Sequence, residues 1–299
     1  LSENIPFLDA LQNRDMLKPL LEKLTKESAL KEFQKYWACD HRLIGVSGNA
    51  EIKNAENEIK KVLEEAQAIQ LKTQKDEALL AFPYEPKPTV PGKIILKEEI
   101  KEFGFTRLFF SNNVVVNVKK TDYKKNCIIF NINFGLGGLS VPAEKEGLSH
   151  LAAIVINQGG LDKLSKTDLT KSLAGKNVSA NFSVAANSFV IQAETIPDDF
   201  ELNLQLCRAL LLNPGFREEA DEVMKKAIDQ MYHSLESNIS EYYQNALMSK
   251  LSRGNRFLFF FERKILETYT FTAVKLWSFS HFIFCGDNFR ISSNLFWES

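Results

Sequence analysis

The sequence has few of the residues that build disulfide frameworks and metal sites. It contains four cysteines and four histidines in 299 residues, and the cysteines (Cys39, Cys127, Cys207 and Cys285) lie far apart. No Cys-x-x-Cys pair and no cluster of cysteine with histidine occurs. Buried free thiols are therefore the favoured interpretation over a disulfide or a metal site.

The sequence also lacks a strong charge of either sign and a long apolar run. The formal net charge is −1, so the basic excess of a nucleic-acid-binding face is missing and we expect no nucleic acid partner. No run approaches the ~18 apolar residues of a membrane span, and no signal peptide is visible. With 44% hydrophobic and 25% charged residues, the composition is that of a globular protein of one or two domains. The start at Leu1 rather than at a methionine predicts a piece of something longer.

The most informative stretch runs from residue 127 to residue 160. Alternating apolar residues at 127–134 predict a strand that is buried mainly on one face: Ile128, Phe130, Ile132 and Phe134. A glycine-rich turn, Gly135–Gly138, follows; no lysine comes after it, so a turn is favoured over a phosphate loop. Helical spacing then places five apolar residues on one face: Leu148, Leu151, Ala152, Val155 and Ile156. Gly147 precedes this helix, and Gly159-Gly160 offers the positive φ that ends one.

This order of strand, glycine-rich turn and helix resembles the pitrilysin/insulinase family of zinc metallopeptidases. In that family the helix carries the motif His-x-x-Glu-His. Two histidines four residues apart can both reach a zinc ion, and the glutamate polarises the attacking water. The helix here reads His150-Leu-Ala-Ala153-Ile154. Ala153 stands at the glutamate position and Ile154 at the second histidine position, so the motif is degenerate.

The resemblance also implies where the third zinc ligand would lie. It is a glutamate on a long downstream helix in the family, and the corresponding positions here are Asp229 and Gln230. Glutamine is a poor zinc ligand, and aspartate is one methylene shorter than glutamate. We interpret His150 as a helix histidine that bonds to a carbonyl or to water. We predict no catalytic, cofactor-binding or metal residue in this chain, and we expect zinc in another part of the parent protein.

Other family-like motifs follow in the same order. Ser165–Asp168 resembles a capping box, Thr195–Asp199 lies where a hairpin leads into a leucine-rich helix, and Asn213–Phe216 introduces a long helix. The resemblance covers most of residues 30–275. It is greatest to the larger bacterial members, which have four related domains with zinc in the first. This chain would hold the end of the second domain and nearly all of the third.

The residues before 96 are expected to contain helices at 17–24, 30–37 and 55–70 and a short strand at 42–47. Pro19 is tolerable only near a helix start. A single strand cannot form a sheet, so we predict that residues 1–72 are the closing part of a preceding insulinase-like domain. Residues 73–95, with four of the nine prolines, are predicted to be a semi-rigid linker; a disordered tail is the alternative.

An α+β insulinase-like domain with a mixed or antiparallel sheet packed on helices is predicted for residues 96–285. Strands are expected at 105–110, 114–118 and 127–134, with a hairpin at 178–193. A helix opens at Pro197, and a long helix is expected from Glu218 to about Leu251. The predicted inner stripe of the long helix is Val223, Ala227, Met231 and Leu235.

The end of the chain departs from the family. The run Arg256–Phe261 stands where a loop is expected, and residues 286–299 form a divergent tail. Packing against a missing domain and a damaged coding sequence both remain open. Ala273–Ile291 and Ala29–Ile52 resemble each other as a helix followed by an apolar segment and a glycine, which suggests a repeated domain end.

Two functions follow from the resemblance. In the first, the chain is a non-catalytic, structural part of a zinc metallopeptidase that shapes a substrate chamber, with the other domains and a peptide as its partners. In the second, it is a stand-alone scaffold or peptide-binding module that kept the fold and lost the metal. An independently active protease would require an unrecognised metal site. The resemblance favours the bacterial periplasm as the compartment.

Overall fold

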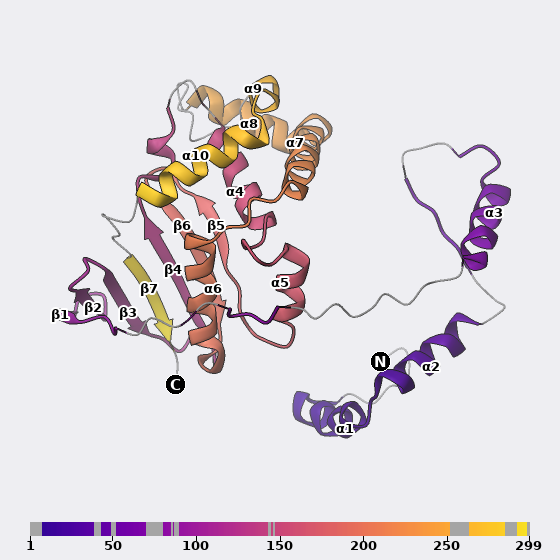
Figure 1. Ribbon diagram of the computed structural model, residues 1–299, viewed down its shortest axis with the longest axis horizontal. Helices are drawn as coiled ribbons and strands as arrows, with labels where there is room; N and C mark the ends of the chain where they lie inside the picture. Colours follow the sequence, from indigo (N-terminus) through magenta and orange to yellow (C-terminus); the bar gives the residue numbers. More distant parts are fainter. Residues whose placement is uncertain are drawn as a thin grey trace. The chain divides into compact units, whose positions relative to one another are not determined.

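The computed structural model describes residues 8–38, 43–48, 52–69, 80–84, 86, 90–142, 145, 147–251, 263–284 and 292–297. The chain divides into two compact units, Leu1–Lys75 and Asp76–Ser299 (Figure 1). The described elements of the first unit are the helices α1 (Ala10–Glu22), α2 (Lys26–Trp37) and α3 (Ala55–Ala68). None of the helices in the described residues is both long and apolar enough to cross a membrane.

The apolar residues of α1 and α2 in the first unit are exposed. Capping boxes at Asp9 and Thr25 start α1 and α2. Pro19 lies inside α1, so the prediction that it sits near a helix start is wrong; the helix accommodates it without the backbone hydrogen bond that proline cannot donate. None of the described residues of this unit is buried. Phe33 and Trp37 of α2 are 60% and 58% exposed.

The short strand predicted at 42–47 is not formed in the part of this stretch that the structure describes, where residues 43–48 are irregular. An extended segment needs a neighbour to satisfy its N–H and C=O groups, and no strand is described elsewhere in the first unit. α3 matches the predicted helix. Its half-buried residues, Ala55, Ile59 and Leu63, follow one another at intervals of four residues on one face.

The second unit is built on a sheet with the strand order β1-β2-β3-β7-β4-β6-β5. Neighbouring strands are antiparallel except β3 and β7, which are parallel. The strands are β1 (Ile94–Ile100), β2 (Phe105–Phe110), β3 (Val115–Lys120), β4 (Ile128–Phe134), β5 (Asn181–Val184), β6 (Phe189–Thr195) and β7 (Ser292–Trp297). The predicted α+β fold with a mixed sheet is therefore confirmed.

Two strands lie outside the predicted ones. β1 contains Lys97, Glu98 and Glu99 and has no buried residue, so the alternation that marks a half-buried strand is absent from its sequence. β7 falls in the predicted divergent tail and lies between β3 and β4. A position in the middle of a sheet is a property of the tertiary structure that a short tail sequence does not reveal.

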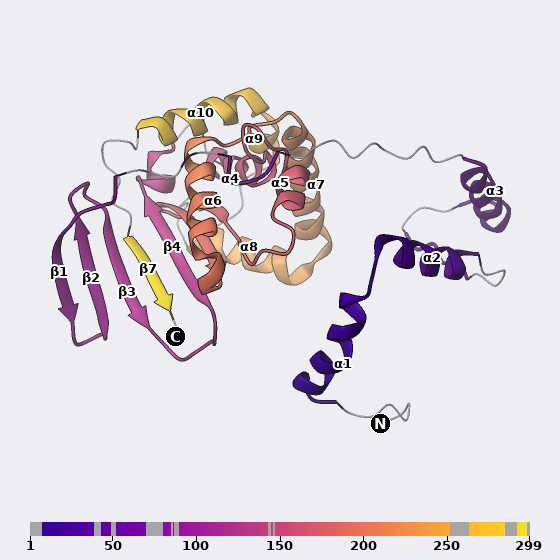
Figure 2. The same cartoon turned by 60° about the horizontal axis from the view of Figure 1, so that its bottom comes forward.

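The helices of this unit lie over one half of the sheet. Figures 1 and 2 show them against β4, β6 and β5, whereas β1, β2 and β3 extend beyond them. Burial follows this arrangement. Alternate residues of β4 and β6 are buried, as the sequence predicts for β4, whereas β1, β2 and β3 contain no buried residue.

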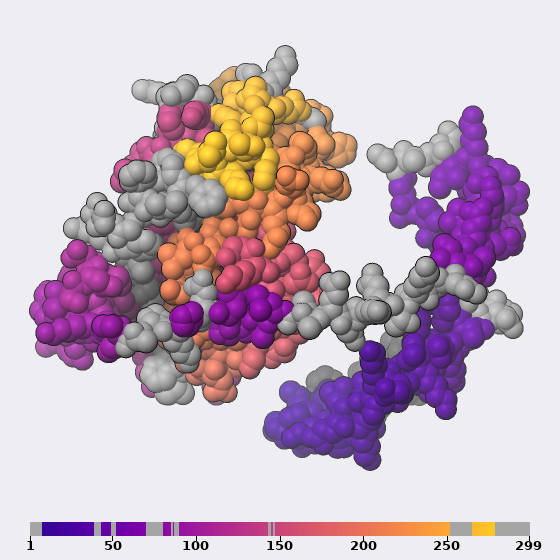
Figure 3. All heavy atoms as spheres, in the orientation of Figure 1, coloured from indigo at the N-terminus to yellow at the C-terminus, as the bar shows by residue number. Residues whose placement is uncertain are grey.

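The helix α4 (Leu148–Gln158) forms the centre of the core. All five apolar residues that helical spacing assigns to its inner face are at most 1% exposed, so that prediction is confirmed. α4 packs against β5, α7 and α10. The remaining helical elements are η1 (Gly137–Ser140), α5 (Lys166–Ser172), η3 (Pro197–Asp199), α6 (Phe200–Leu212), α7 (Glu219–Ser237), α8 (Ile239–Leu251), α9 (Arg263–Glu267) and α10 (Phe271–Phe284). In the space-filling view, the described atoms of α10 (yellow) lie on the surface of the unit (Figure 3).

The single long helix predicted from Glu218 to Leu251 is wrong. It is divided into α7 and α8 at Asn238, whose backbone is extended (φ −108°, ψ 106°). The Asn238 side chain accepts hydrogen bonds from the N–H groups of Ser240 and Glu241. These bonds cap the N-terminus of α8, so that α7 ends and a second helix begins at this residue. The inner stripe is also displaced from the predicted one: the buried residues of α7 are Ala220, Met224, Ile228, Tyr232 and Leu235.

The predicted repeat of the domain end is not observed. α10 runs to Phe284, so the apolar segment expected to follow the helix belongs to it in large part, whereas α2 ends at Trp37. The run Arg256–Phe261 lies outside the described residues, as do Cys39, His41 and Cys285.

Candidate functional site

The glycine-rich turn before α4 packs directly on the β5–β6 hairpin. The N–H groups of Gly138 and Leu139 donate to the carbonyls of Ala185 and Ala186 at 2.8 and 2.9 Å. Gly137 has φ +55°, and a Cβ there would lie 2.3 Å from the Ser188 carbonyl oxygen. Only glycine fits such an approach. The sheet therefore fixes the chain immediately before α4 begins.

The three degenerate motif positions lie on one side of α4, as their spacing requires. His150 is exposed, and Ala153 and Ile154 are half-buried. Although the residue as a whole is exposed, burial of the imidazole among its neighbours lowers the pKa of His150. The ring is therefore neutral at pH 7, the form that binds metals. The methyl group of Ala153 and the alkyl chain of Ile154 offer neither a base nor a second ligand.

The two downstream positions do not complete a metal site. Asp229 and Gln230 are both exposed on α7, next to the buried Ile228. Within the described ranges, no group of three or more histidine, cysteine, aspartate or glutamate side chains is placed to hold a metal ion. A catalytic zinc ion requires three protein ligands and an open position. The residues present do not fit one, and no catalytic step through zinc follows from them.

Among the other histidines, the structure describes the side chain of His233 alone. His233 is exposed on α7. The position of His281 is part of α10, although its side chain lies outside the described residues. Cys127 and Cys207 are buried free thiols, as the sequence predicts. Burial raises the pKa of Cys207 to about 12, so this thiol stays protonated and unreactive at neutral pH.

An unpredicted contact closes the outer edge of β5. The Asn157 amide donates to the Phe182 carbonyl (2.7 Å), and its oxygen accepts from the Phe182 N–H (2.8 Å). The Ala185 N–H bonds to the Ser188 carbonyl, and Phe182 is opposite Ile191. The alternation of an antiparallel ladder therefore turns the Phe182 backbone away from β6. Asn157 thus occupies the groups that an added peptide strand would use at this position.

The glycines at the C-terminal end of α4 contact the Asn213–Phe216 turn. The Gly215 N–H donates to the Gly160 carbonyl at 3.0 Å, and a Cβ at Gly215 would lie 2.1 Å from the Gly159 carbonyl oxygen. Arg217 donates to the carbonyls of Leu161 and Asp162. The glycines at the end of α4 and the Asn213–Phe216 turn are therefore one packed junction, which positions α7 against α4.

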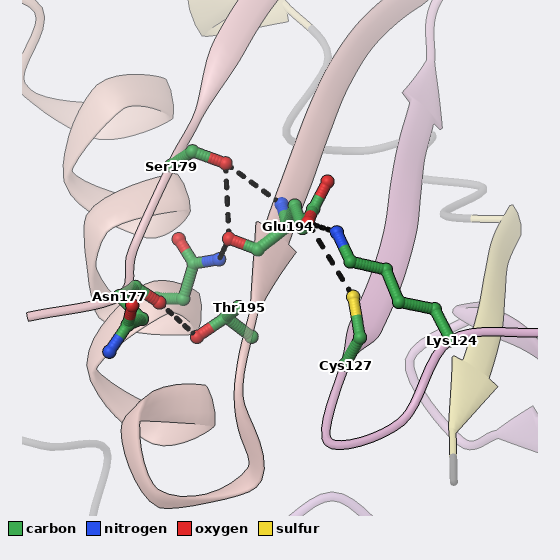
Figure 4. A network of polar contacts seen from close by, with 7 residues as sticks. Lys124, Cys127, Asn177, Ser179, Glu194 and Thr195 are labelled. Atoms are coloured by element: carbon green, nitrogen blue, oxygen red, sulfur yellow. Dashed lines mark hydrogen bonds and ion pairs between the residues drawn. The ribbon is translucent and has the colours of Figure 1, made fainter. Parts of the chain in front are cut away.

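A polar network ties two loops to the end of β6 (Figure 4). The Lys124 ammonium pairs with the Glu194 carboxylate, and Cys127 Sγ lies 3.6 Å from the same oxygen. The Ser179 hydroxyl bonds to the N–H and C=O groups of Glu194 (2.9 and 3.0 Å). Thr195 Oγ1 donates to the Asn177 carbonyl at 2.6 Å. Lys124 is therefore exposed but anchored.

The electrostatics of this network indicate a structural role. The hydrogen bond from Lys124 lowers the pKa of Glu194. Burial, together with the Glu194 charge, raises the pKa of Cys127, which is the opposite of what a nucleophilic thiol needs. Asp199 accepts the Asn177 N–H at 2.8 Å; this bond, with the nearby Lys176, lowers its pKa.

Comparisons with known proteins identify the fold. No protein-family model matches the chain. The chain is 23% identical over 208 residues to the chloroplastic stromal processing peptidase of Arabidopsis thaliana, which covers 68% of this chain and 16% of that protein. Because the alignment covers so little of that peptidase, it does not show whether this chain shares its activity.

Two solved structures that are similar to this chain are those of proteases. The periplasmic protease PqqL from Escherichia coli has a TM-score of 0.56 at 18% identity, over 99% of this chain and 32% of that one. The ferredoxin protease FusC, solved as a mutant in complex with Arabidopsis ferredoxin, has a TM-score of 0.55 at 14% identity, with the same coverage. The chain has a pitrilysin-like fold. It spans about a third of the length of these solved chains.

The sequence located the motif helix but not the contacts that surround it. The pairing of Asn157 with Phe182 joins residues that are 25 positions apart, and an asparagine in a helix carries no signal of such a partner. The sequence did hold a signal for the junction of Gly159, Gly160 and Gly215, because glycines allow two segments of backbone to approach closely.

Proposed function

We propose that this chain is a non-catalytic part of a pitrilysin-like zinc peptidase and forms part of the wall of its substrate chamber. The observation that carries the proposal is α4. Its buried inner face and its packing against α7 provide the framework of a zinc-binding helix. Ala153 and Ile154 provide neither base nor ligand. Peptide hydrolysis would take place at zinc in another domain of the parent protein.

The placement within the parent is also a proposal: the end of the second and nearly all of the third of four domains. It is supported by the alignment of 99% of this chain with 32% of each of two larger proteases. The exposed apolar residues of α1 and α2 support it too, because such faces suit contact with a sheet from the rest of the protein. The partners would be the other domains and a peptide. The bacterial periplasm is the proposed compartment, since PqqL is a periplasmic protease.

The first test is the zinc content of the purified chain after dialysis against metal-free buffer. We expect occupancy near zero and no hydrolysis of peptides after zinc is added back. Occupancy near one that is lost in His150→Ala would overturn the proposal, because it would mean that a complete metal site exists around His150.

The second test restores the missing chemistry. The triple variant Ala153→Glu, Ile154→His and Gln230→Glu should bind zinc if α4 and α7 keep the family arrangement. The same triple variant with His150→Ala is the matched control and should not. If neither binds while both remain folded, α4 and α7 do not form a zinc-binding framework.

The parent protein itself separates the two functions. An antibody against this chain should detect a protein much larger than 34.0 kDa, with an intact His-x-x-Glu-His motif encoded upstream. A stable endogenous protein of the size of this chain, without that motif, would favour the stand-alone module instead.

A further inference from the structure

A cavity of about 500 Å³ lies between α4, α5 and α6 and the segment 174–180. Its size falls in the range of pockets that hold small molecules. The apolar part of its lining comes from all three helices: Ile156, Leu169, Leu173, Leu206 and Leu210. Figure 1 shows how α5 lies beside α6 at this end of the unit. The cavity is separate from the polar face of α4 at His150, which does not line it.

Three of the polar side chains that line the cavity already form hydrogen bonds within the protein. Asn157 is held by Phe182, and Ser179 by the Glu194 backbone. The hydroxyl of Thr170 donates to the Lys166 carbonyl at 2.9 Å. The two lysines, Lys166 and Lys176, are the only charged residues in the lining, which includes no acid.

The two lysines lie at opposite ends of α5. Lys166 is its first residue, and its ammonium pairs with none of the described residues; Lys176 follows the helix and lies 3.5 Å from Asp199. A cavity with an apolar interior and with the unpaired charge of Lys166 and the ammonium of Lys176 at its rim is complementary to an anion with an apolar body. A neutral apolar ligand would leave Lys166 unpaired, and a cation would be repelled.

We infer that this cavity binds a carboxylic acid with an apolar body, which it holds with Lys166 and Lys176 at the rim and the leucines inside. A medium-chain fatty acid and the C-terminal residue of a peptide with an apolar side chain share this chemistry. The inference does not depend on the proposed role in a peptidase.

Decanoate is the probe that tests it. Titration into the full chain below the micellar concentration should give saturable one-to-one binding. Lys166→Ala and Lys176→Ala should each weaken binding about two- to fivefold, as expected for charge pairs at an exposed rim, and together about tenfold. Ala174→Trp should weaken it about tenfold or more, because Ala174 lines the cavity and is itself exposed, so that a large side chain fills the space without disturbing the core.

Matched controls lie on the same helix. Lys171→Ala and Thr167→Trp change exposed residues of α5 outside the lining and should leave the affinity unchanged. Decanol should lose no affinity in the lysine variants. The inference is overturned if the lysine variants and Lys171→Ala weaken decanoate binding equally, or if Ala174→Trp, shown to be folded by circular dichroism, binds decanoate as the unchanged chain does.

A second arm identifies the source of the carboxylate. The peptide acetyl-Ala-Leu-Leu is titrated with a free and with an amidated C-terminus. If the peptide with the free C-terminus binds, the amidated peptide does not, and the lysine variants weaken this binding as they weaken that of decanoate, the cavity is assigned to peptide ends. Binding of decanoate without the peptide assigns it to fatty acids. Failure of both probes rejects the site.

Discussion

The helices α4 and α2 both carry apolar residues at helical spacing but differ in whether those residues are buried. The inner residues of α4 are at most 1% exposed, whereas Phe33 and Trp37 of α2 are 60% and 58% exposed. Both helices have an apolar face, although α2 contains several charged residues and α4 contains no lysine, arginine, aspartate or glutamate. The difference lies in the partner: α4 has β5, α7 and α10 against it, and no described residue of the first unit is buried by another element. Periodicity therefore specifies which face is apolar, not whether something covers it.

Removing one buried side chain should give the largest effect in this comparison. Leu151→Ala leaves a cavity at a residue that is 0% exposed and should lower the free energy of unfolding by about 2–5 kcal/mol. Phe33→Ala should change it by no more than about 0.5 kcal/mol. Urea unfolding followed by far-ultraviolet circular dichroism measures both. An equal loss in Phe33→Ala would show that α2 is covered in the protein in solution.

Backbone crowding distinguishes the units in a second way. In Gly215→Ala the new Cβ would meet the Gly159 carbonyl oxygen at 2.1 Å, which requires a backbone shift and should cost about 1–3 kcal/mol or more. Gly45→Ala in the first unit meets nothing within 4 Å and is the matched control. Thermal unfolding of the two variants compares them; an unchanged midpoint for Gly215→Ala would contradict the close junction between Gly159 and Gly215.

The third comparison concerns asparagine side chains. Asn157→Ala leaves the buried Phe182 N–H and C=O groups without their partner and should cost about 1–3 kcal/mol. Asn57→Ala in α3 removes only an exposed hydrogen bond to Asn54 and should cost less than about 0.5 kcal/mol. Hydrogen exchange at the Phe182 amide is the specific readout. Unchanged protection in Asn157→Ala would mean that another group closes the edge of β5.

A pH dependence should be the weakest of these differences. The folded-state pKa of Asp199 is lowered, first by the Asn177 N–H and then by Lys176. Its contribution to stability is therefore complete above the unfolded-state pKa and is lost as the pH falls through the folded-state value. Asp199→Asn should flatten this part of the acid unfolding curve. Glu56→Gln, which removes the exposed pair with Lys60 in α3, is the control; an identical change in both variants would argue against a distinct role for Asp199.

Much of the second unit could be predicted because its elements bury one face. The alternation in β4 and the helical spacing in α4 identified every inward-facing residue of these two elements correctly. β1 escaped prediction because an exposed edge strand needs no alternation. The break at Asn238 escaped prediction because neither proline nor glycine lies beside it in the sequence, and one side-chain amide decided between one helix and two.

The candidate site shows the same division. That Ala153 and Ile154 can supply neither a base nor a metal ligand is readable from the sequence, because chemistry depends on residue type and spacing. The closure of the β5 edge by Asn157, the junction at Gly215 and the cavity beside α5 join segments that are distant in the sequence, and no local pattern records them. Residue type and spacing thus specify the inward faces of β4 and α4 and the inability of Ala153 and Ile154 to act as base or ligand. Which surfaces meet depends on the folded chain, because contact free energy depends on partners that the local sequence does not encode.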